Sequence, residues 1–112
     1  MPLIQTLICQ KTGVDWTSGT TGDDAHQVLI NDIDIHVSPE NLVAFQQAYA
    51  STENISFSLV ATIVDGKLHL TREWGSDTQY NSYKAAINDI EDAINAQLEA
   101  IGWTFEETTQ TV

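Results

Sequence analysis

The clearest structural signal in the chain is the stretch ISFSLVATIVDGKLHLTREW, residues 55–74. It contains two strand-like runs joined by Asp65-Gly66, a dipeptide that is strongly favoured in two-residue hairpin turns. With that turn, one face of the hairpin becomes apolar and the other becomes mostly polar, which is typical of a sheet with one buried face. Arg72 is the exception, a charged residue on the apolar face. The apolar face consists of Ile55, Phe57, Leu59, Ala61, Ile63, Leu68, Leu70 and Trp74.

A long amphipathic helix is predicted directly after this hairpin. Residues 76–79 match a capping box, in which Ser76 caps the first turn and Gln79 reaches back to the start of the helix. Apolar residues then recur at three- and four-residue steps over 77–101. Gly102 follows as a natural helix end. We therefore expect one helix over 77–101.

The segment before the first hairpin, HQVLINDIDIHV at 26–37, predicts a second hairpin rather than one continuous strand. A turn at Asn31-Asp32 would gather the apolar residues on one face, whereas a continuous strand would divide them between two faces. Ser38 and Pro39 then indicate the start of a helix over 39–50, because serine caps free backbone N–H groups and proline is tolerated at the first helical position.

The two ends of the chain complete the expected fold. Apolar residues on both faces of 3–10 predict a central N-terminal strand. A polar, glycine-rich stretch at 11–25 predicts a flexible loop, and 106–112 predicts a frayed acidic tail, with room for a short strand at 103–105. We expect a single α+β domain over 1–112, with an antiparallel or mixed sheet and helices packed on one face.

Composition narrows the classes of function. Of 112 residues, 16 are acidic and four are Lys or Arg, which gives a formal charge of −12. Direct binding to nucleic acid or to an anionic membrane surface is not expected, because both depend on basic residues. No apolar run approaches the ~20 residues of a membrane span, and the N-terminus lacks the pattern of a signal peptide. We expect a cytoplasmic protein, and the lone Cys9 is expected to be buried.

Metal and cofactor binding are not expected either. Asp32, Asp34 and His36 would align as ligands only if 26–37 formed one continuous strand, and the predicted hairpin separates them. The glycines of the long loop match no phosphate-binding pattern.

The sequence shows no recognisable catalytic context, so we expect the chain not to be an enzyme. A small enzyme or ligand-binding fold remains an alternative, with a pocket between the sheet and the long helix. A deep cavity near His69, Arg72 and Tyr80 would favour it.

The strongest functional hint is the uneven distribution of charge. After Lys84 the chain contains no Lys or Arg, although ordinary solvated helix faces mix both signs. The main hypothesis is a non-enzymatic module whose acidic helical face occupies a basic surface on a partner protein. A nucleic-acid-binding protein is a natural partner, and the module would then resemble nucleic-acid-mimicking inhibitors from phage or mobile elements. The expected partner-binding residues are Asp89, Glu91, Asp92 and Glu99, supported by exposed Trp16 and Trp103.

Blander interpretations remain open for each of these features. The acidic face can be an ordinary solvated surface, and both tryptophan side chains can be buried in the hydrophobic core. The alternative function is a structural or assembly subunit that forms a homo-oligomer, such as a homodimer, through helix or sheet-edge contacts.

Overall fold

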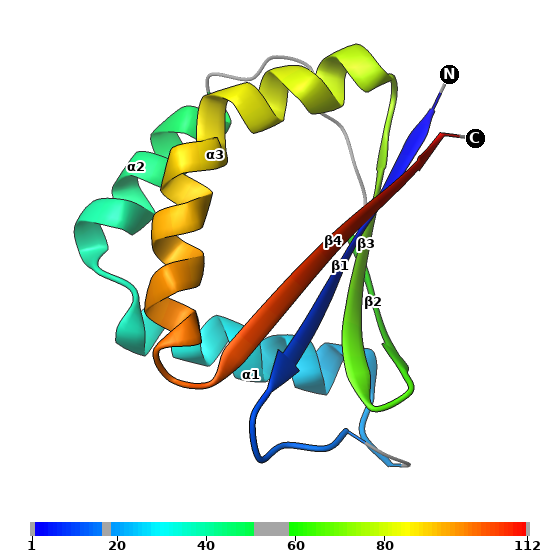
Figure 1. Cartoon of the computed structure of the whole chain (residues 1–112), viewed down its shortest axis with the longest axis vertical. Helices are drawn as coiled ribbons and strands as arrows, with labels where there is room; N and C mark the ends of the chain where they lie inside the picture. The colour runs from blue at the N-terminus through cyan, green and yellow to red at the C-terminus, as the bar shows by residue number, and fades with distance from the viewer. Residues whose placement is uncertain (1, 17–18, 51–58, 112) are drawn as a thin grey trace.

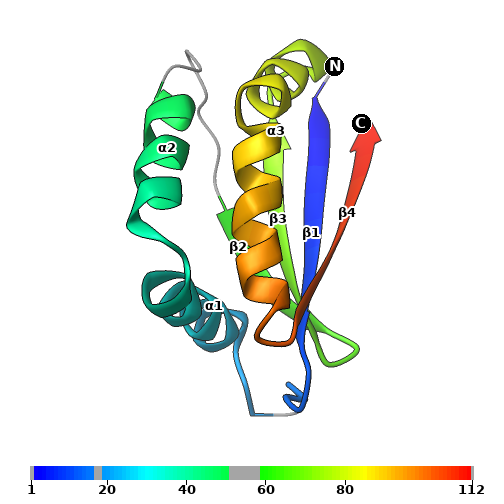
Figure 2. The ribbon, with the colours of Figure 1, turned by 60° about the vertical axis from the view of Figure 1, so that its left-hand side comes forward.

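Three helices cover one face of a four-stranded sheet in the computed structural model, which describes residues 2–16, 19–50 and 59–111 (Figures 1 and 2). This confirms the α+β class and the placement of the helices on one face. The strands are β1 (Leu3–Lys11), β2 (Leu59–Val64), β3 (Lys67–Trp74) and β4 (Trp103–Thr111), and the helices are α1 (Gly22–His36), α2 (Pro39–Ala50) and α3 (Asp77–Glu99).

The sheet has the strand order β2-β3-β1-β4, and every neighbouring pair is antiparallel. β1 is therefore central, as predicted. β1 and β2 run parallel and are connected through α1 and α2, while β3 and β4 run parallel and are connected through α3. Crossovers between parallel strands of one sheet are almost always right-handed, which places both sets of helices on the same face.

The predicted hairpin at 55–74 is confirmed from Leu59 onward, whereas 55–58 lie outside the described residues. Leu59 pairs with Arg72 and Val64 with Lys67, as the two-residue turn requires. Asp65 and Gly66 both have positive φ, 53° and 76°, which is the geometry of a type I′ turn.

The predicted hairpin at 26–37 is wrong, because residues 26–36 belong to helix α1 and Val37 is its C-cap. The side chain of Thr21 caps the helix by accepting a hydrogen bond of 3.1 Å from the Asp24 N–H. Ala25 and Leu29, four residues apart on one face of this helix, are its buried residues. The isoleucines fit a hairpin face as well as a helix face, so tertiary packing determines the outcome.

A close approach between α1 and the sheet supports this packing. A Cβ atom added at Gly22 would lie 2.0 Å from the carbonyl oxygen of Ala61 on β2. Only glycine allows the first turn of α1 to lie so near a strand backbone.

The expected frayed tail is also wrong, because 103–111 form β4, which pairs with β1 along its whole length, from Lys11–Trp103 to Leu3–Thr111. A strand at the edge of a sheet needs only one neighbour, and its outward side chains meet water, so a polar sequence is tolerated there. The two chain termini consequently lie close together (Figure 1).

The loop expected at 11–25 is shorter than predicted, because Lys11 belongs to β1 and 22–25 belong to α1. Trp16 is only 4% exposed, and its ring lies 5.8 Å from that of Trp103. It thus attaches the segment to the core. Cys9 is fully buried as expected, and burial raises the pKa of its thiol to about 12.

The predicted helices at 39–50 and 77–101 are confirmed, although α3 ends at Glu99. The Ser76 hydroxyl accepts a hydrogen bond of 3.2 Å from the Gln79 N–H, as a capping box requires. Within the described ranges, no helix combines the length and apolarity needed to span a membrane.

Candidate ligand cavity

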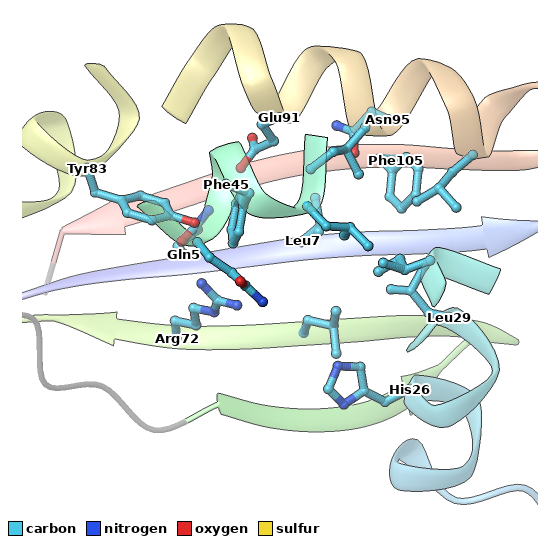
Figure 3. Close-up of a pocket in the computed structure, with 16 residues that line it drawn as sticks. Gln5, Leu7, His26, Leu29, Phe45, Arg72, Tyr83, Glu91, Asn95 and Phe105 are labelled. Atoms are coloured by element: carbon cyan, nitrogen blue, oxygen red, sulfur yellow. The ribbon is translucent and has the colours of Figure 1, made fainter. Parts of the chain in front are cut away.

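A cavity of about 390 Å³ lies between the inner face of the sheet and the three helices (Figure 3). Its wall is mostly apolar, and polar side chains enter it at a few positions. The lining residues come from β1, α1, α2, β3, α3 and β4: Gln5, Leu7, His26, Leu29, Ile33, Leu42, Phe45, Gln46, Leu70, Arg72, Tyr83, Glu91, Ile94, Asn95, Leu98 and Phe105.

Three polar side chains from three elements gather at one end of the cavity. The antiparallel register places Gln5 of β1 directly opposite Arg72 of β3. Tyr83 of α3 reaches toward both of them, as Figure 3 shows. We call these three residues the donor end, because the amide, the guanidinium and the phenol all carry hydrogen-bond donors.

The orientation of the Gln5 amide is fixed by two hydrogen bonds. Its Oε1 accepts from the indole N–H of Trp74 at 2.9 Å, and its Nε2 donates to Glu107 Oε1 at 2.5 Å. An indole N–H can only donate, so the amide oxygen must face Trp74. Gln5 is 8% exposed, and this network satisfies a polar group that burial would otherwise penalise.

Glu107 of β4 contacts both Gln5 of β1 and two residues of helix α3. The Tyr80 hydroxyl donates to Glu107 Oε1 at 2.6 Å, and Lys84 Nζ lies 3.1 Å from Glu107 Oε2 and 2.6 Å from Glu91 Oε1. Burial alone would raise the pKa of Glu107, but the hydrogen bonds from Tyr80 and Lys84 lower it below its ordinary value. The Lys84 ammonium therefore faces two carboxylates, one of which, Glu91, lines the cavity.

Two further titratable side chains line the cavity. Burial raises the pKa of Tyr83, although the charge of Arg72 and a hydrogen bond with it act in the opposite direction. Burial also lowers the pKa of His26, and the positive charge of Arg72 lowers it further. At neutral pH the cavity thus contains a neutral phenol and a mainly neutral imidazole beside a cationic guanidinium.

Most of the remaining lining residues are apolar, and the polar ones among them are His26, Gln46, Glu91 and Asn95. Figure 3 shows Leu7, Leu29 and Phe105 away from the donor end, on the side where β1, α1 and β4 meet the cavity. The apolar residues that line the cavity are Leu7, Leu29, Ile33, Leu42, Phe45, Leu70, Ile94, Leu98 and Phe105.

The cavity corresponds in part to the pocket that the sequence allowed between the sheet and the long helix. Arg72 lines it, as that alternative required. His69 instead occupies a position on the opposite face of the sheet, between Ile8 and Thr62 in the strand register. The hydroxyl of Tyr80 contacts Glu107 rather than the cavity.

The residues expected to form an acidic binding surface are divided by the structure. Asp89, Asp92 and Glu99 are exposed on α3. Glu91 is different, because it pairs with Lys84 and lines the cavity.

The expectation of exposed aromatic anchors is wrong. Trp16, in the loop after β1, and Trp103, the first residue of β4, are 4% and 1% exposed, because both side chains pack into the hydrophobic core. The indole N–H of Trp103 donates to Asp32 Oδ2 at 2.8 Å, which supplies a partner for its buried polar atom.

Asp32, one of the two aspartates that a continuous strand would align as metal ligands, has a structural role. Asp32 forms an ion pair of 2.6 Å with Lys11, and the hydrogen bond from Lys11 is the main cause of its lowered pKa. In the part of the chain that the structure describes, no cluster of three or more His, Cys, Asp or Glu side chains could hold a metal ion.

Gln5, His26 and Tyr83 were not predicted as site residues. The sequence did carry one signal for Gln5, a polar residue in the inward row that otherwise contains Leu3, Leu7 and Cys9. His26 could not be placed, because α1 was interpreted as a hairpin. Tyr83 appeared to belong to the apolar stripe of the long helix.

No family model and no curated protein sequence matches the chain. Several solved structures are similar in fold. A de novo designed protein with a ferredoxin fold has a TM-score of 0.54 at 19% identity, covering 100% of this chain and 87% of its own. A dimeric ferredoxin-like protein from an uncultured marine organism has a TM-score of 0.53 at 11% identity, with 98% and 93% covered.

A third is SnoaB, a cofactor-independent oxygenase from Streptomyces nogalater, with a TM-score of 0.51 at 10% identity and coverage of 99% and 92%. Identities this low establish the fold alone. The strand order β2-β3-β1-β4 and the helices on one face agree with it. This chain therefore has a ferredoxin-like α+β fold.

Proposed function

We propose that this protein binds a small organic molecule in the cavity between the sheet and its helices. The observation that carries this proposal is the composition of the cavity wall, which is apolar over most of its area and has a few convergent polar groups at one end. That composition, with a volume of about 390 Å³, is typical of ligand sites.

The packing of the rest of the molecule supports this proposal. Native interiors leave few spaces larger than a water molecule, because each unfilled space reduces stability. Ile87, Leu68 and Cys9 are fully buried at 0% exposure, so the chain does form a core that excludes water. A space of this size beside such a core is better explained by an occupant than by poor packing.

Titration with the neutral fluorophore aminoanthracene tests the proposal. Leu7→Phe places a larger side chain in the cavity and should remove most of the binding measured by fluorescence. Ile8→Phe, the next residue along β1 and on the opposite face of the sheet, is the matched control and should retain it. Equal binding by both variants, or no binding by the wild-type protein, would contradict the proposal.

A second proposed function is the occupation of a basic protein surface by the acidic face of α3, without catalysis. Asp89, Asp92 and Glu99 are exposed, and their spacing of three and seven residues places them on one side of the helix. Lys84, the last basic residue of the chain, faces Glu91 and Glu107. It is therefore engaged by other carboxylates, which leaves this face strongly negative.

Capture of partners from a cell lysate at low and high salt tests this second function. Basic nucleic-acid-binding proteins should bind at low salt and be released at high salt, because screening weakens contacts between exposed charges. The triple variant Asp89→Asn, Asp92→Asn, Glu99→Gln should lose them. Capture that the triple variant leaves unchanged would exclude this face as the binding surface.

We further propose that two copies associate through the face of the sheet opposite the helices, which we call the open face. One structural neighbour is described as dimeric. Among the described strand residues, the open face carries only two of the chain's carboxylates, Glu73 and Glu106. On a chain of charge −12, this face repels a second copy least. Val60 and Val64 are exposed there, by 52% and 44%.

Light scattering after gel filtration tests this association. The wild-type protein should elute as a dimer whose mass does not depend on salt. Val60→Glu should give a monomer, whereas Val43→Glu, an equally exposed valine on α2, should not. A monomeric wild-type protein would contradict the proposal.

A further inference from the structure

We infer that the ligand of the cavity is an uncharged molecule with hydrogen-bonding groups at two separate points of an apolar body, one for His26 and one for Asn95. This inference rests on the proposed ligand-binding function and adds the chemical class of the ligand to it. The class covers hydroxyl, carbonyl and amide groups, because a neutral imidazole and a side-chain amide can each donate and accept.

Two polar side chains line the cavity without an intramolecular partner. Among the described residues, neither the His26 ring nor the Asn95 amide forms a hydrogen bond, whereas Gln5 is held by Trp74 and Glu107. In the same part of the chain, no buried side-chain nitrogen or oxygen lacks a partner. The polar atoms of His26 and Asn95 are therefore accessible to a molecule of the size of water. A ligand in the cavity can supply the hydrogen bonds that the fold does not.

The two side chains reach the cavity from opposite edges of the sheet. His26 lies in α1, whose first turn lies against β2 at Gly22 and Ala61. Asn95 lies in the C-terminal half of α3, the half that leads into β4. β2 and β4 are the two edge strands, and Figure 3 shows Leu7 of the central strand β1 between His26 and Asn95. An apolar part of the ligand therefore has to pass Leu7 between its two polar groups.

The charges around the cavity cancel, which leaves no counter-charge for a charged ligand. Arg72 and Glu91 are the charged residues among the described ones that line it, one of each sign. Lys84 Nζ lies 2.6 Å from Glu91 Oε1 and 3.1 Å from Glu107 Oε2, which adds one further charge of each sign. Burial and the charge of Arg72 lower the pKa of His26, so its ring stays mainly neutral at neutral pH. An ionised group on the ligand would lose its hydration here without compensation.

Isothermal titration of the wild-type protein with four probes tests this inference. Octanol, octane-1,8-diol, octanoate and octylamine share one flexible chain, which can adapt to the separation of the two side chains. Octanol should bind about tenfold or more tightly than octanoate and octylamine, because burial of an ionised group costs more than burial of a hydroxyl. The diol is more soluble in water than octanol. It should nevertheless bind at least as tightly, because the cavity offers a hydrogen bond to each hydroxyl.

Two variants assign these hydrogen bonds to their residues. His26→Leu and Asn95→Leu should each weaken binding of the diol about tenfold, because one hydroxyl would then face a leucine. Octanol affinity should change by less than about threefold in either variant, since its single hydroxyl can use the residue that remains. His36→Leu and Asn88→Leu are the matched controls, because they make the same exchanges at exposed positions of the same helices. Both controls should bind the diol as the wild-type protein does.

Binding of octanoate or octylamine as tightly as octanol, or weaker binding of the diol than of octanol by the wild-type protein, would overturn the inference. So would an unchanged diol affinity in either folded variant, an equal loss in its control, or binding of aminoanthracene without the diol. All of these results leave the proposed function intact. The first two comparisons use the wild-type protein alone, so they decide the matter even if a variant fails to fold. Failure of aminoanthracene and all four chains to bind removes the proposed function itself.

Discussion

The two faces of the sheet are made by the same strands and differ in nearly every physical respect. The inward face carries large apolar side chains, two fully formed polar networks and the cavity (Figure 3). The open face is dominated by β-branched residues, including Ile4, Thr6, Ile8, Val60 and Thr62. Successive side chains along a strand point to opposite faces of the sheet, so each face can have its own composition.

From this difference we propose separate tasks for the two faces. Polar groups on the inward face are positioned by burial and by fixed partners, which suits selective recognition of a small molecule. The open face carries few carboxylates and exposes Val60 and Val64, which suits contact with another surface. The predictions that follow change one face at a time and use the other face as the control.

The largest expected effect concerns stability. Leu68→Ala on the inward face should reduce the free energy of unfolding by about 2–5 kcal/mol, because it creates a cavity where the side chain was fully buried. Val64→Ala, across the same hairpin turn but on the open face, should cost about 1 kcal/mol or less. Urea denaturation measures both. Similar losses for the two variants, at a protein concentration where the chain is monomeric, would contradict this difference in burial.

A smaller effect is expected from the polar network of the inward face. Gln5→Leu should cost about 1–3 kcal/mol, because the buried indole N–H of Trp74 loses its acceptor. The neighbouring Thr6→Val on the open face should change stability by about 0.5 kcal/mol or less. Urea unfolding of both variants gives the comparison, and a neutral Gln5→Leu would mean that water replaces the amide.

The smallest expected effect is a pH dependence. The pKa of His26 lies below its ordinary value of 6.5 in the folded protein, mainly through burial and then through the charge of Arg72. The unfolded chain therefore binds more protons as the pH falls below about 6.5, and stability decreases in that direction. His26→Asn should flatten the profile between neutral and mildly acidic pH.

His69→Asn on the open face is the control for this measurement. Comparing thermal unfolding of the two variants separates the contribution of His26 from that of the carboxylates, which both variants share. A His26→Asn profile as steep as that of the control would remove the electrostatic role given to His26.

The sequence predicted the elements whose local signals agree with their packing. The Asp65-Gly66 turn fixes both the hairpin and its register, and Ser76 with Gln79 fixes the start of α3. The segment 22–36 could not be predicted, because its isoleucines satisfy the period of a strand pair and that of a helix. The contact between Gly22 and β2 resolves this ambiguity, and such a long-range contact leaves no local pattern.

The site was less predictable than the fold. The exceptional position of Arg72 was visible from the hairpin alone. Its neighbour Gln5 lies 67 residues earlier and is placed opposite it only by the pairing of β1 with β3. The burial of Trp16 and Trp103 likewise depends on contacts between distant segments, so their availability to a partner could not be judged from composition.

The central claim is that the inward face binds a small molecule and the open face does not. Methyl NMR spectra recorded during an aminoanthracene titration test it most directly, because methyl groups report each face separately. The account predicts shifts for the methyl groups of Leu7, Leu29, Leu70 and Leu98, with those of Ile4, Ile8, Val60 and Val64 unchanged. Shifts confined to the second group, or absent from both at saturating aminoanthracene, would contradict it.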